Sequence, residues 1–450
     1  MEDDRIDKEQ LPLKETFKLL FGASRGFWLV NVVNFGDGIA YFGMLNLMTL
    51  FLGSMVLHMS DKLTGLSVSM FTGLVTLFMF GGGFISDRIG VRRALTLCLG
   101  MLLGGRALLV LSPAFGGAAH AAAWAGLIVM AFGEGVIQPA LYAGVKEYTD
   151  ARTATISYSL LYAIMNLGIM AESFFSPFVR TDAPFLGGVK GLGWGIPGVF
   201  WLCIAITALM LVSHLGLFTA KVEREDRDPA AVPKAEGPEK PFGEMLRELP
   251  FLDARFMFFI FILLPVRTLF AHQWLTLPDY IMRAYPAAVG AKYEWISGLN
   301  PLIIVIFVPL IAALTRRVSV ITMMVIGTTL SALTTFLLVP GPNLHALIAY
   351  VLLFSLGEAV WSSRFLEYVS EIAPPGRVGA YMGLAGIPWF LAKFTTGLYS
   401  GTMLNRFVPQ SGPQDTGTMW LIYGAVACLS PLGLIAAGRW LMHRPAKASA

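Results

Sequence analysis

Ionisable side chains stand inside stretches of this sequence that are otherwise long and apolar. They are Asp37, Arg106, Glu134, Glu172, Arg267, His272, Asp279, Glu358, Arg364, Glu367 and Lys393. An ionised group at the centre of a helix in lipid costs about 2.5–3.5 kcal/mol even on the mildest scale, so a functional role is the first interpretation. Asp279, Glu367 and Glu172 are discounted, because they stand close enough to the segment ends to reach headgroups or water.

The acids in this set are able to take up and release protons. The candidates for proton coupling are Glu358, Glu134 and Asp37, in that order, with His272 as a fourth. Burial raises the proton affinity of a carboxylate, and a nearby guanidinium lowers it. Moving Arg267 or Arg364 relative to an acid would therefore load and release a proton. The alternatives are ion pairs between helices that never titrate and, for His272, a hydrogen-bonded spacer.

Polar and aromatic residues beside these charges are candidates for binding a solute, and several share a helix face with a charge at a spacing of three or four residues. The candidates are Asn34, Tyr41, Gln138, Arg267, Gln273, Trp274, Trp361 and Arg364. Amide, hydroxyl and guanidinium groups fix the polar atoms of a ligand, and aromatic rings form pocket walls. A single aromatic residue in an apolar segment more often faces lipid, so only the tryptophans with polar neighbours are retained.

The sequence lacks common catalytic motifs of enzymes. It contains no HExxH, GxSxG or phosphate-loop pattern and no cluster of cysteine and histidine. Its three cysteines, Cys98, Cys203 and Cys428, lie far apart within apolar segments, as small core residues do. We therefore expect no catalytic residues, no metal and no cofactor.

The composition places the chain in a membrane. Of its 450 residues 56% are hydrophobic and 14% are charged, against about 25% charged in an average soluble domain. Twelve apolar stretches are long enough to cross a bilayer, which takes about 20 residues. They are 27–52, 64–86, 94–112, 122–144, 155–178, 193–219, 256–282, 294–315, 318–339, 345–368, 379–401 and 418–441. In lipid every backbone polar group must be paired within its own segment, so we predict an all-α polytopic membrane protein.

Lysine and arginine are distributed unevenly between the two sides of these spans. With a cytoplasmic N-terminus, the cytoplasmic segments hold 23 of the 33 basic residues and the outer loops hold six. The positive-inside rule therefore predicts that both termini are cytoplasmic. The acidic start MEDDRIDKEQ is unlike a secretory signal peptide, so we expect the first span to remain as an anchor. We expect an integral protein of a bacterial inner membrane, whose net charge of +4 reflects this sorting and not nucleic-acid binding.

One long polar segment, residues 220–249, divides the spans into six and six. It is rich in proline and charge, as a solvated linker is. The expected units are a cytoplasmic N-terminal segment (1–26), a six-helix bundle (27–219), a cytoplasmic linker (220–255), a second six-helix bundle (256–441) and a cytoplasmic tail (442–450).

The two halves resemble each other at an offset of 224 residues. This offset carries GEGVIQP, which starts at Gly133, onto GEAVWSS, which starts at Gly357. It also carries the two arginines at 92–93 onto the two at 316–317. Two matches at one offset indicate an internal duplication. Parallel repeats of this kind are typical of major facilitator transporters, which bind their solute between the halves near the membrane midplane.

The segment GFISDRIGVRR, residues 83–93, resembles the signature G-x-x-x-D-R-x-G-x-R-R that the major facilitator superfamily places between its second and third helices. The matching residues are Gly83, Asp87, Arg88, Gly90, Arg92 and Arg93. The resemblance implies that these charges form a network against the other half, which latches the cytoplasmic side in the outward-facing state. It also implies that the first, fourth, seventh and tenth helices line a central cavity, and each of these helices carries a charge here.

A narrower resemblance is to the proton-coupled oligopeptide transporters. It rests on four segments in order along the chain, DGIAYFGM (37–44), YAIMNLGIM (162–170), SGLNPLIIVIFVPLIAAL (297–314) and SLGEAVWSSRFLEYVSEIAPPGRVGAYMGL (355–384). The resemblance implies that Asn166, Asn300 and Glu358 contact the solute, so both asparagines join the solute-binding candidates.

Several ionisable residues of that family are replaced in this sequence. The replacements are Asn34, Gly38, Gln138 and Ala271. Gly38 stands where the family has an arginine, so Asp37 lacks that partner. If Asp37 faces the cavity, we expect Arg267 or Lys393 beside it; the alternative is that it faces lipid and the resemblance does not hold there. These changes argue against ordinary symport of di- and tripeptides.

The observations together predict a secondary active transporter that works by alternating access. We expect a monomer in the bilayer that carries a small polar or zwitterionic organic solute, peptide-like at most, by proton-coupled symport. The alternatives are a proton-antiport exporter of drugs or metabolites and a receptor or scaffold on a transporter fold. The fifth-span segment NLGIMAESFFSPF (166–178) lacks the G-x-x-x-G-P pattern of such exporters, which favours import.

Overall fold

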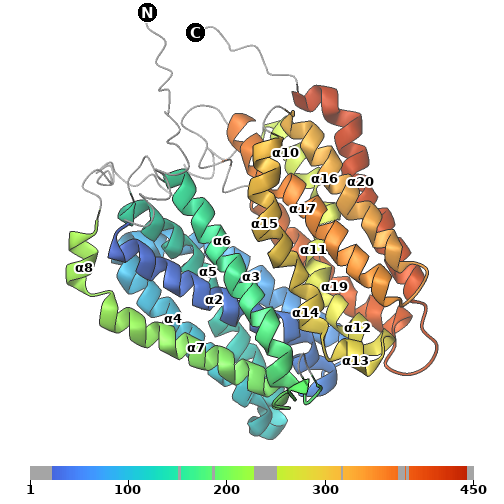
Figure 1. Cartoon of the computed structure of the whole chain (residues 1–450), viewed down its shortest axis with the longest axis horizontal. Helices are drawn as coiled ribbons and strands as arrows, with labels where there is room; N and C mark the ends of the chain where they lie inside the picture. The colour runs from blue at the N-terminus through green and yellow to red at the C-terminus, as the bar shows by residue number, and fades with distance from the viewer. Residues whose placement is uncertain are drawn as a thin grey trace, which may run out of the picture.

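A computed structural model describes residues 23–149, 154–184, 188–227, 251–315, 318–372, 381 and 385–442. Within these residues the chain is almost entirely helical, and the one β-bridge joins Pro184 to Lys190. Two groups of helices stand side by side, one coloured blue to green and the other yellow to red (Figure 1). We call them the N-bundle and the C-bundle.

The N-bundle consists of long helices that follow one another along the chain. They are α2 (Arg25–Leu50), α3 (Asp61–Ile89), α4 (Val91–Leu111), α5 (Ala119–Tyr148), α6 (Ala154–Arg180) and α7 (Gly195–Leu217). The short turns η1 (Phe51–Met55) and η2 (Ser112–Ala118) follow α2 and α4. Ser24 and Ser60 accept hydrogen bonds from first-turn amides and so fix where α2 and α3 begin.

The C-bundle contains more and shorter helices. They are α10 (Ala254–Ile262), α11 (Leu264–Leu275), α12 (Leu277–Ala284), α13 (Ala287–Gly290), α14 (Tyr293–Ser297), α15 (Leu299–Leu314), α16 (Val320–Thr334) with η4 (Thr335–Leu338), α17 (Leu344–Ile372), α19 (Ile387–Phe407) and α20 (Thr416–Met442). Pro265 and Pro278 lie in the first turns of α11 and α12. A proline lacks the amide that would continue the preceding helix, so α10, α11 and α12 share one broken span.

Each of the twelve predicted spans falls on helix, so the all-α fold is confirmed for the part of the chain that is described. The ends differ by several residues: α5 continues to Tyr148 beyond the predicted end at 144. The span predicted at 256–282 is broken twice, and most of the first residues of the one predicted at 379–401 lie outside the described part. By length and hydropathy alone, eight described segments qualify as membrane spans, and one of these runs through both α4 and α5.

The helices alternate in direction, which gives the molecule two ends. The linker side holds the start of α2, the turn between α3 and α4, and the short helix α8 (Ala220–Glu225). The far side holds the end of α2, the start of α3 and the ends of α6 and α12. Helix α8 lies against the N-bundle through an ion pair between Glu225 and Arg25 (3.0 Å). The rest of the predicted linker up to residue 250, nearly all of the N-terminal segment and most of the predicted tail lie outside the described residues.

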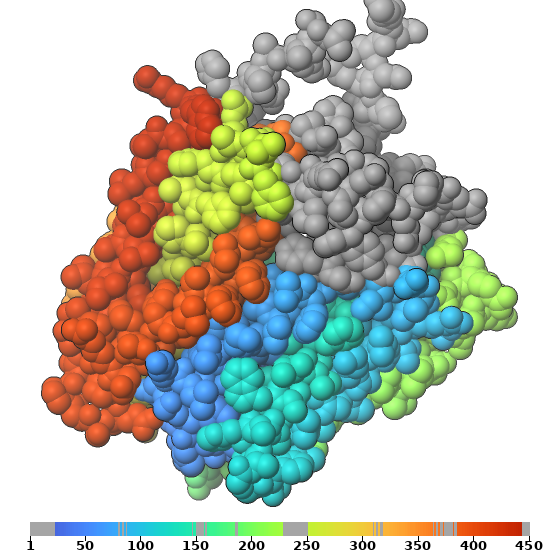
Figure 2. All heavy atoms as spheres, turned by 180° about the vertical axis from the view of Figure 1, so that it is seen from behind, coloured from blue at the N-terminus to red at the C-terminus, as the bar shows by residue number. Residues whose placement is uncertain are grey.

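The two bundles touch along α3 and α19 (Figure 2). Glycines let these helices pack backbone to backbone, because a Cβ at Gly397 would overlap Ser69 and a Cβ at Gly401 would overlap the carbonyl of Asp61. Ser69 also donates a hydrogen bond to the carbonyl of Phe394 (2.7 Å). Small residues allow such close packing in membranes, where van der Waals contact holds helices together. The contact begins at the far side and closes that part of the bundle interface.

Candidate functional site

Arg106 is the centre of a buried charge cluster in the N-bundle. Its Nη2 donates to Asp37 Oδ1 on α2 (3.0 Å) and to Glu134 Oε1 on α5 (2.6 Å). Its Nη1 donates to the hydroxyl of Thr207 on α7. Arg106 is fully buried, and the two acids are only 3% and 2% exposed. Four helices therefore meet at one guanidinium group, and we call Asp37, Arg106 and Glu134 the acid–base cluster.

Glycines on α4 and α5 bring Arg106 within reach of its partner. Gly105 faces Gly126, and a Cβ on either would lie 2.9–3.0 Å from the carbonyl oxygen of the other. The two helices pack closely at this point because neither glycine has a side chain. Glu134 lies two turns further along α5, where the guanidinium of Arg106 meets it.

The acid–base cluster contains one base and two acids. With both acids ionised its net charge is −1, and one added proton brings that charge to zero. An uncompensated charge in a low-dielectric interior is costly, whereas a neutral cluster can be sealed from water. Neighbouring acids that interact strongly titrate as a pair, so the cluster as a whole is the unit that would carry a proton.

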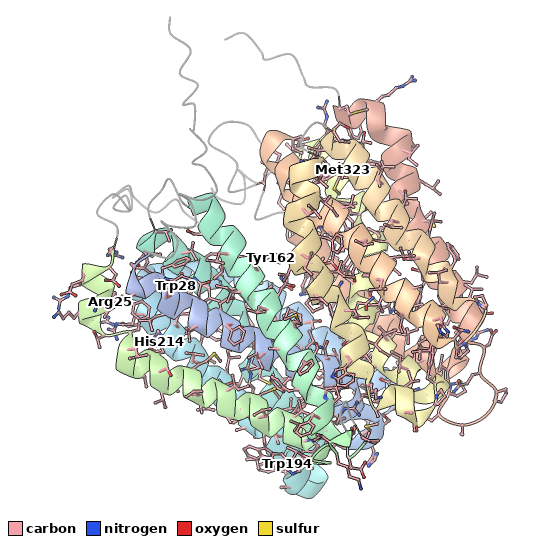
Figure 3. All side chains as sticks on the ribbon, in the orientation of Figure 1. Arg25, Trp28, Tyr162, Trp194, His214 and Met323 are labelled. Atoms are coloured by element: carbon pink, nitrogen blue, oxygen red, sulfur yellow. The ribbon has the colours of Figure 1, made fainter. Side chains whose placement is uncertain are left out.

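Both acids of the cluster face a cavity of about 140 Å³ between the bundles. Its polar lining consists of Asp37, Tyr41, Glu134, Gln138 and, from α19 of the C-bundle, Lys393. Asp37 and Tyr41 share a face of α2, and Glu134 and Gln138 share a face of α5, each at a spacing of four residues, so all four side chains are directed to one space. Tyr162 on α6 also points toward the gap between the bundles (Figure 3).

In the C-bundle, Glu358 lies apart from the acid–base cluster. Asn300 of α15 donates to Glu358 Oε2 on α17 (2.8 Å) and to the hydroxyl of Ser355 (3.0 Å). The structure thus brings together two of the three residues assigned to solute contact from the resemblance, Asn300 and Glu358. They form a second polar site that does not line the 140 Å³ cavity.

Arg267 lies among aromatic rings in the C-bundle. Its Cζ is 4.3 Å from the ring centroid of Phe365, 5.0 Å from that of Trp389 and 5.5 Å from that of Trp361. The side chain is fully buried, and its Nε and Nη1 have no hydrogen-bond partner among the described residues. Lys393 Nζ lies 5.6 Å from the same Trp389 ring. The two bases therefore share one tryptophan.

His272 and its neighbours on α11 take part in packing and hydrogen bonding within the C-bundle. The two ring nitrogens of His272 lie 2.7 Å from the hydroxyl of Thr276 and 3.1 Å from that of Tyr399. Its ring stacks on Tyr423 with 3.8 Å between centroids. This geometry is that of the hydrogen-bonded spacer, the alternative role for His272. Gln273 donates to the hydroxyl of Tyr350 (3.0 Å), and Trp274 is partly buried against the core.

Three other candidates for solute binding make contacts within or between helices. Asn34 donates to the carbonyl of Leu161 (2.6 Å) and joins α2 to α6. Asn166 donates to the carbonyl one turn earlier in α6 (2.9 Å). Arg364 donates to the carbonyl (3.0 Å) and hydroxyl (2.9 Å) of Thr315. None of the three lines the 140 Å³ cavity.

The basic partner of Asp37 differs from the expected one. We expected Arg267 or Lys393, but Arg106 binds Asp37, and Arg267 has no acidic partner among the described residues. The sequence did not reveal this pair because α4 carries no acid that would point to Arg106 as a counter-ion. The available signal was the presence of an arginine in the middle of an apolar span, which requires a partner on another helix.

Two acids that were expected to reach water are buried. Glu172 is fully buried because α6 continues for two turns beyond it to Arg180, and the carboxylate packs beside Gly43 of α2. Asp279 is 3% exposed and binds Arg283 one turn along (2.8 Å). The side chain of Glu367 lies outside the described part.

The signature segment at 83–93 forms the tight turn between α3 and α4. Gly90 has φ +83°, a conformation that favours glycine. Arg92 binds Glu223 of α8 (2.8 Å), and Arg88 and Arg93 are exposed. The side chain of Asp87 lies outside the described part, so the latch of this segment against the other half stays a prediction.

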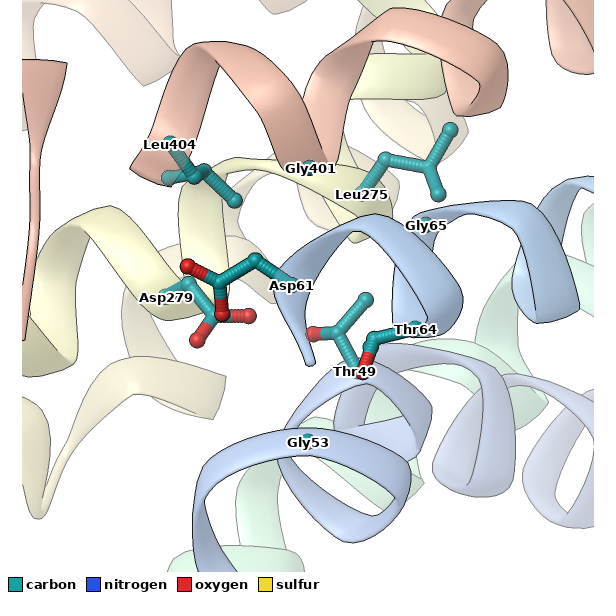
Figure 4. A pocket seen from close by; sticks show the side chains of 9 residues that line it. All are labelled: Thr49, Gly53, Asp61, Thr64, Gly65, Leu275, Asp279, Gly401 and Leu404. Atoms are coloured by element: carbon teal, nitrogen blue, oxygen red, sulfur yellow. The ribbon is translucent and has the colours of Figure 1, made fainter. Parts of the chain in front are cut away.

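Ion pairs join the two bundles at the far side. Arg283 of α12 binds both carboxylate oxygens of Asp61 on α3 (2.7 and 2.8 Å). Arg180 of α6 binds both oxygens of Glu294 on α14 (2.6 and 2.7 Å). Asp61 and its neighbour Asp279 line a cleft that is almost filled (Figure 4).

These far-side pairs were not identified from the sequence. The pairing of residues from distant loops is not visible in hydropathy. The available signal was that the outer loops hold only six basic residues. Arg180 and Arg283 are two of these six.

Solved transporters share this fold. A POT family transporter in complex with 5-aminolevulinic acid aligns with a TM-score of 0.70 at 17% identity, covering 94% of this chain and 98% of that one. A peptide transporter POT in complex with sulfate aligns with a TM-score of 0.69 at 17% identity over 97% and 99% of the two chains. The nucleoside transporter NupG aligns equally well, with a TM-score of 0.70 at 13% identity over 92% and 99% of the two chains. At these identities the likeness shows the fold alone and does not distinguish peptide from nucleoside transporters.

Sequence comparison identifies the family. Two uncharacterised MFS-type transporters of Bacillus subtilis (strain 168) are similar: YqjV at 22% identity over 73% of this chain and 74% of its own, and YhjO at 21% over 84% and 86%. The model of the Major Facilitator Superfamily matches residues 27–392. This chain is a membrane transporter that belongs to the major facilitator superfamily.

Proposed function

We propose that this transporter moves a small polar or zwitterionic organic solute by proton-coupled symport, and that the acid–base cluster carries the proton. One observation supports this most strongly: Asp37 and Glu134 line the cavity between the bundles while Arg106 binds both from behind. An acid that exchanges protons with solvent must meet the transport path, and its counter-ion must stay with the protein. The cluster satisfies both requirements.

The far side of the molecule is the closed side. The ion pairs Arg283–Asp61 and Arg180–Glu294 and the contact of α3 with α19 all lie there. If the linker side is cytoplasmic, as the positive-inside rule predicts, this is an inward-facing arrangement. Transport then requires that the far-side ion pairs break and re-form once in each cycle.

Charge explains how proton and solute would move together. In the outward-facing state, water brings a proton to Glu134 or Asp37 and makes the acid–base cluster neutral. A neutral cluster tolerates the sealed intermediate, whereas an ionised one resists it. When the linker side opens, the proton leaves and Arg106 again balances both ionised carboxylates, with which it makes hydrogen bonds.

Proteoliposomes loaded with a pH-sensitive dye test this proposal. Amino acids, dipeptides and nucleosides are added outside, one class at a time, without an imposed gradient. Symport acidifies the lumen because solute and proton enter together, whichever way the protein is inserted. A rise in lumen pH would instead indicate the antiport exporter. Solute entry without a change in lumen pH would contradict proton coupling.

A further inference from the structure

We infer that the transported solute carries an anionic group, a carboxylate or a phosphate, which binds at Lys393 and Arg267 of the C-bundle. This inference names the solute class and rests on the proposed transport function. It is drawn from two bases that have no acidic partner among the described residues and that meet at one tryptophan.

Arg267 is a buried base without a counter-ion among the described residues. A fully buried guanidinium normally has an acid or several carbonyl groups around it, because an unpaired buried charge is costly. Here three aromatic rings surround it, and two of its nitrogens have no hydrogen-bond partner in the described part. Contacts with the faces of rings offset only part of the lost hydration. A ligand that supplies a negative charge would complete this site.

Lys393 connects this site to the transport path. It is the lining residue that the C-bundle contributes to the 140 Å³ cavity, opposite Asp37 and Glu134. Its Nζ and the Cζ of Arg267 both lie within 5.6 Å of the Trp389 ring centroid. An anion that enters the cavity thus meets Lys393 first. Arg267 lies near the same tryptophan ring as Lys393.

The charges across the cavity set the orientation of the solute. Asp37 and Glu134 would repel a negative group on the N-bundle wall, so the anionic end would face the C-bundle. The other end, neutral or cationic, would face the two acids. Arginine binds carboxylates and phosphates with two parallel hydrogen bonds, which suits either kind of anion.

Matched pairs of compounds that differ by one negative charge test the inference. The pairs are dialanine with dialanine amide, benzoate with benzamide, and glycerol 3-phosphate with glycerol. A ligand that binds the folded state raises its apparent stability, so thermal unfolding of the purified full chain is recorded with each compound at fixed pH. We expect the anionic member of at least one pair to raise the melting temperature by several degrees and its neutral counterpart to leave it unchanged. The pair that responds tells carboxylate from phosphate.

Two variants connect the response to the site. Lys393→Gln and Arg267→Met should each abolish the shift caused by the anion. Arg267→Met should also leave the unliganded protein as stable as wild type or more so, because it removes an unpaired buried charge; a purely structural arginine would behave in the opposite way. Lys292→Gln is the matched control, since Lys292 also lies over a tryptophan, Trp295 at 5.9 Å, but on the far side.

Three outcomes would overturn the inference: no anion stabilises the wild-type chain, the neutral members stabilise it equally, or the shift survives both substitutions. The assay involves no proton gradient and no flux. A failure here would therefore leave proton coupling standing, and a failure of the dye assay would leave anion binding standing.

Discussion

Arg106 balances two carboxylates with one guanidinium, and its removal would leave both acids without a counter-ion. Breaking a buried ion pair from one side costs about 3–5 kcal/mol. We expect Arg106→Met to lower the free energy of unfolding by this amount, measured by denaturant unfolding in detergent. Adding Asp37→Asn and Glu134→Gln should restore most of the loss, because the acids then need no counter-ion.

Arg93→Gln serves as the control for this comparison. Arg93 is exposed at the linker side, and substitutions at such positions usually change stability by less than about 0.5 kcal/mol. If Arg106→Met were no more destabilising than Arg93→Gln, the acid–base cluster would not be the buried unit described above.

At this scale the sequence identified the charges but not their pairing. Asp37 and Glu134 could be selected because lipid makes any intramembrane charge conspicuous. That Arg106 binds both depends on how α4 packs against α2 and α5, which is determined by contacts such as that of Gly105 with Gly126. Hydropathy does not encode such contacts, so the pairing could not be derived from it.

Helices were the most predictable level of the structure. A bilayer requires long apolar segments with internally paired backbones, so the spans could be located from composition alone. The breaks between α10, α11 and α12 were not predicted, although Pro265 and Pro278 are visible in the sequence. Membrane helices often tolerate proline, because neighbouring groups pair the freed backbone atoms. The residue type alone therefore does not decide between a kink and a break.

The contact between α3 and α19 gives a prediction at this level. A Cβ at Gly401 would overlap the Asp61 carbonyl, so Gly401→Ala should separate the helices or shift their backbones. Such overpacking typically costs about 1–3 kcal/mol. The measurement is again denaturant unfolding in detergent.

Gly100→Ala is the matched control, because Gly100 lies on the exposed face of α4 with open space around it. Alanine in a helix is favoured over glycine by roughly 0.5–1 kcal/mol, so this control should be neutral or slightly stabilising. Equal effects of the two substitutions would show that the α3–α19 contact is looser than described.

For the whole molecule, the sequence predicted a major facilitator transporter through the duplication and the segment 83–93, and the family is confirmed. The conformational state was not predictable. It depends on ion pairs between loops that lie far apart in sequence, such as Asp61 with Arg283. In the proposed alternating-access cycle one sequence folds into both the inward- and outward-facing states, so residue patterns alone do not select between them.

Removing the far-side ion pairs should shift the equilibrium from the closed to the open far side. Leaving a buried acid without its partner costs about 3–5 kcal/mol. Loss of both arginines should therefore destabilise the closed far side by at least the roughly 5.5 kcal/mol that moves an equilibrium from 1:99 to 99:1. Spin labels are placed at exposed positions 62 and 406, at the far ends of α3 and α19. Double electron–electron resonance then measures the distance between the labels, which reports the opening of the far side. We expect Arg283→Gln combined with Arg180→Gln to lengthen the distance between the labels.

Arg227→Gln is the control, because its pair with Glu147 is largely exposed and lies within the linker side. It should leave the distribution of distances unchanged. A far side that stays closed without both arginines would mean that the α3–α19 contact alone determines the state.

Coupling of proton movement to solute movement by the acid–base cluster depends on an ionisable group at position 134, so Glu134→Gln should break it. Two measurements are made in proteoliposomes with the solute found in the dye assay. The first is uptake driven by a pH gradient that is acidic outside. The second is exchange of labelled for unlabelled solute without a gradient. We expect Glu134→Gln to lose gradient-driven accumulation but to retain exchange. Glu147 lies at the surface end of the same helix, and Glu147→Gln should behave as wild type. Gradient-driven accumulation that persists in both Glu134→Gln and Asp37→Asn would contradict coupling by the acid–base cluster.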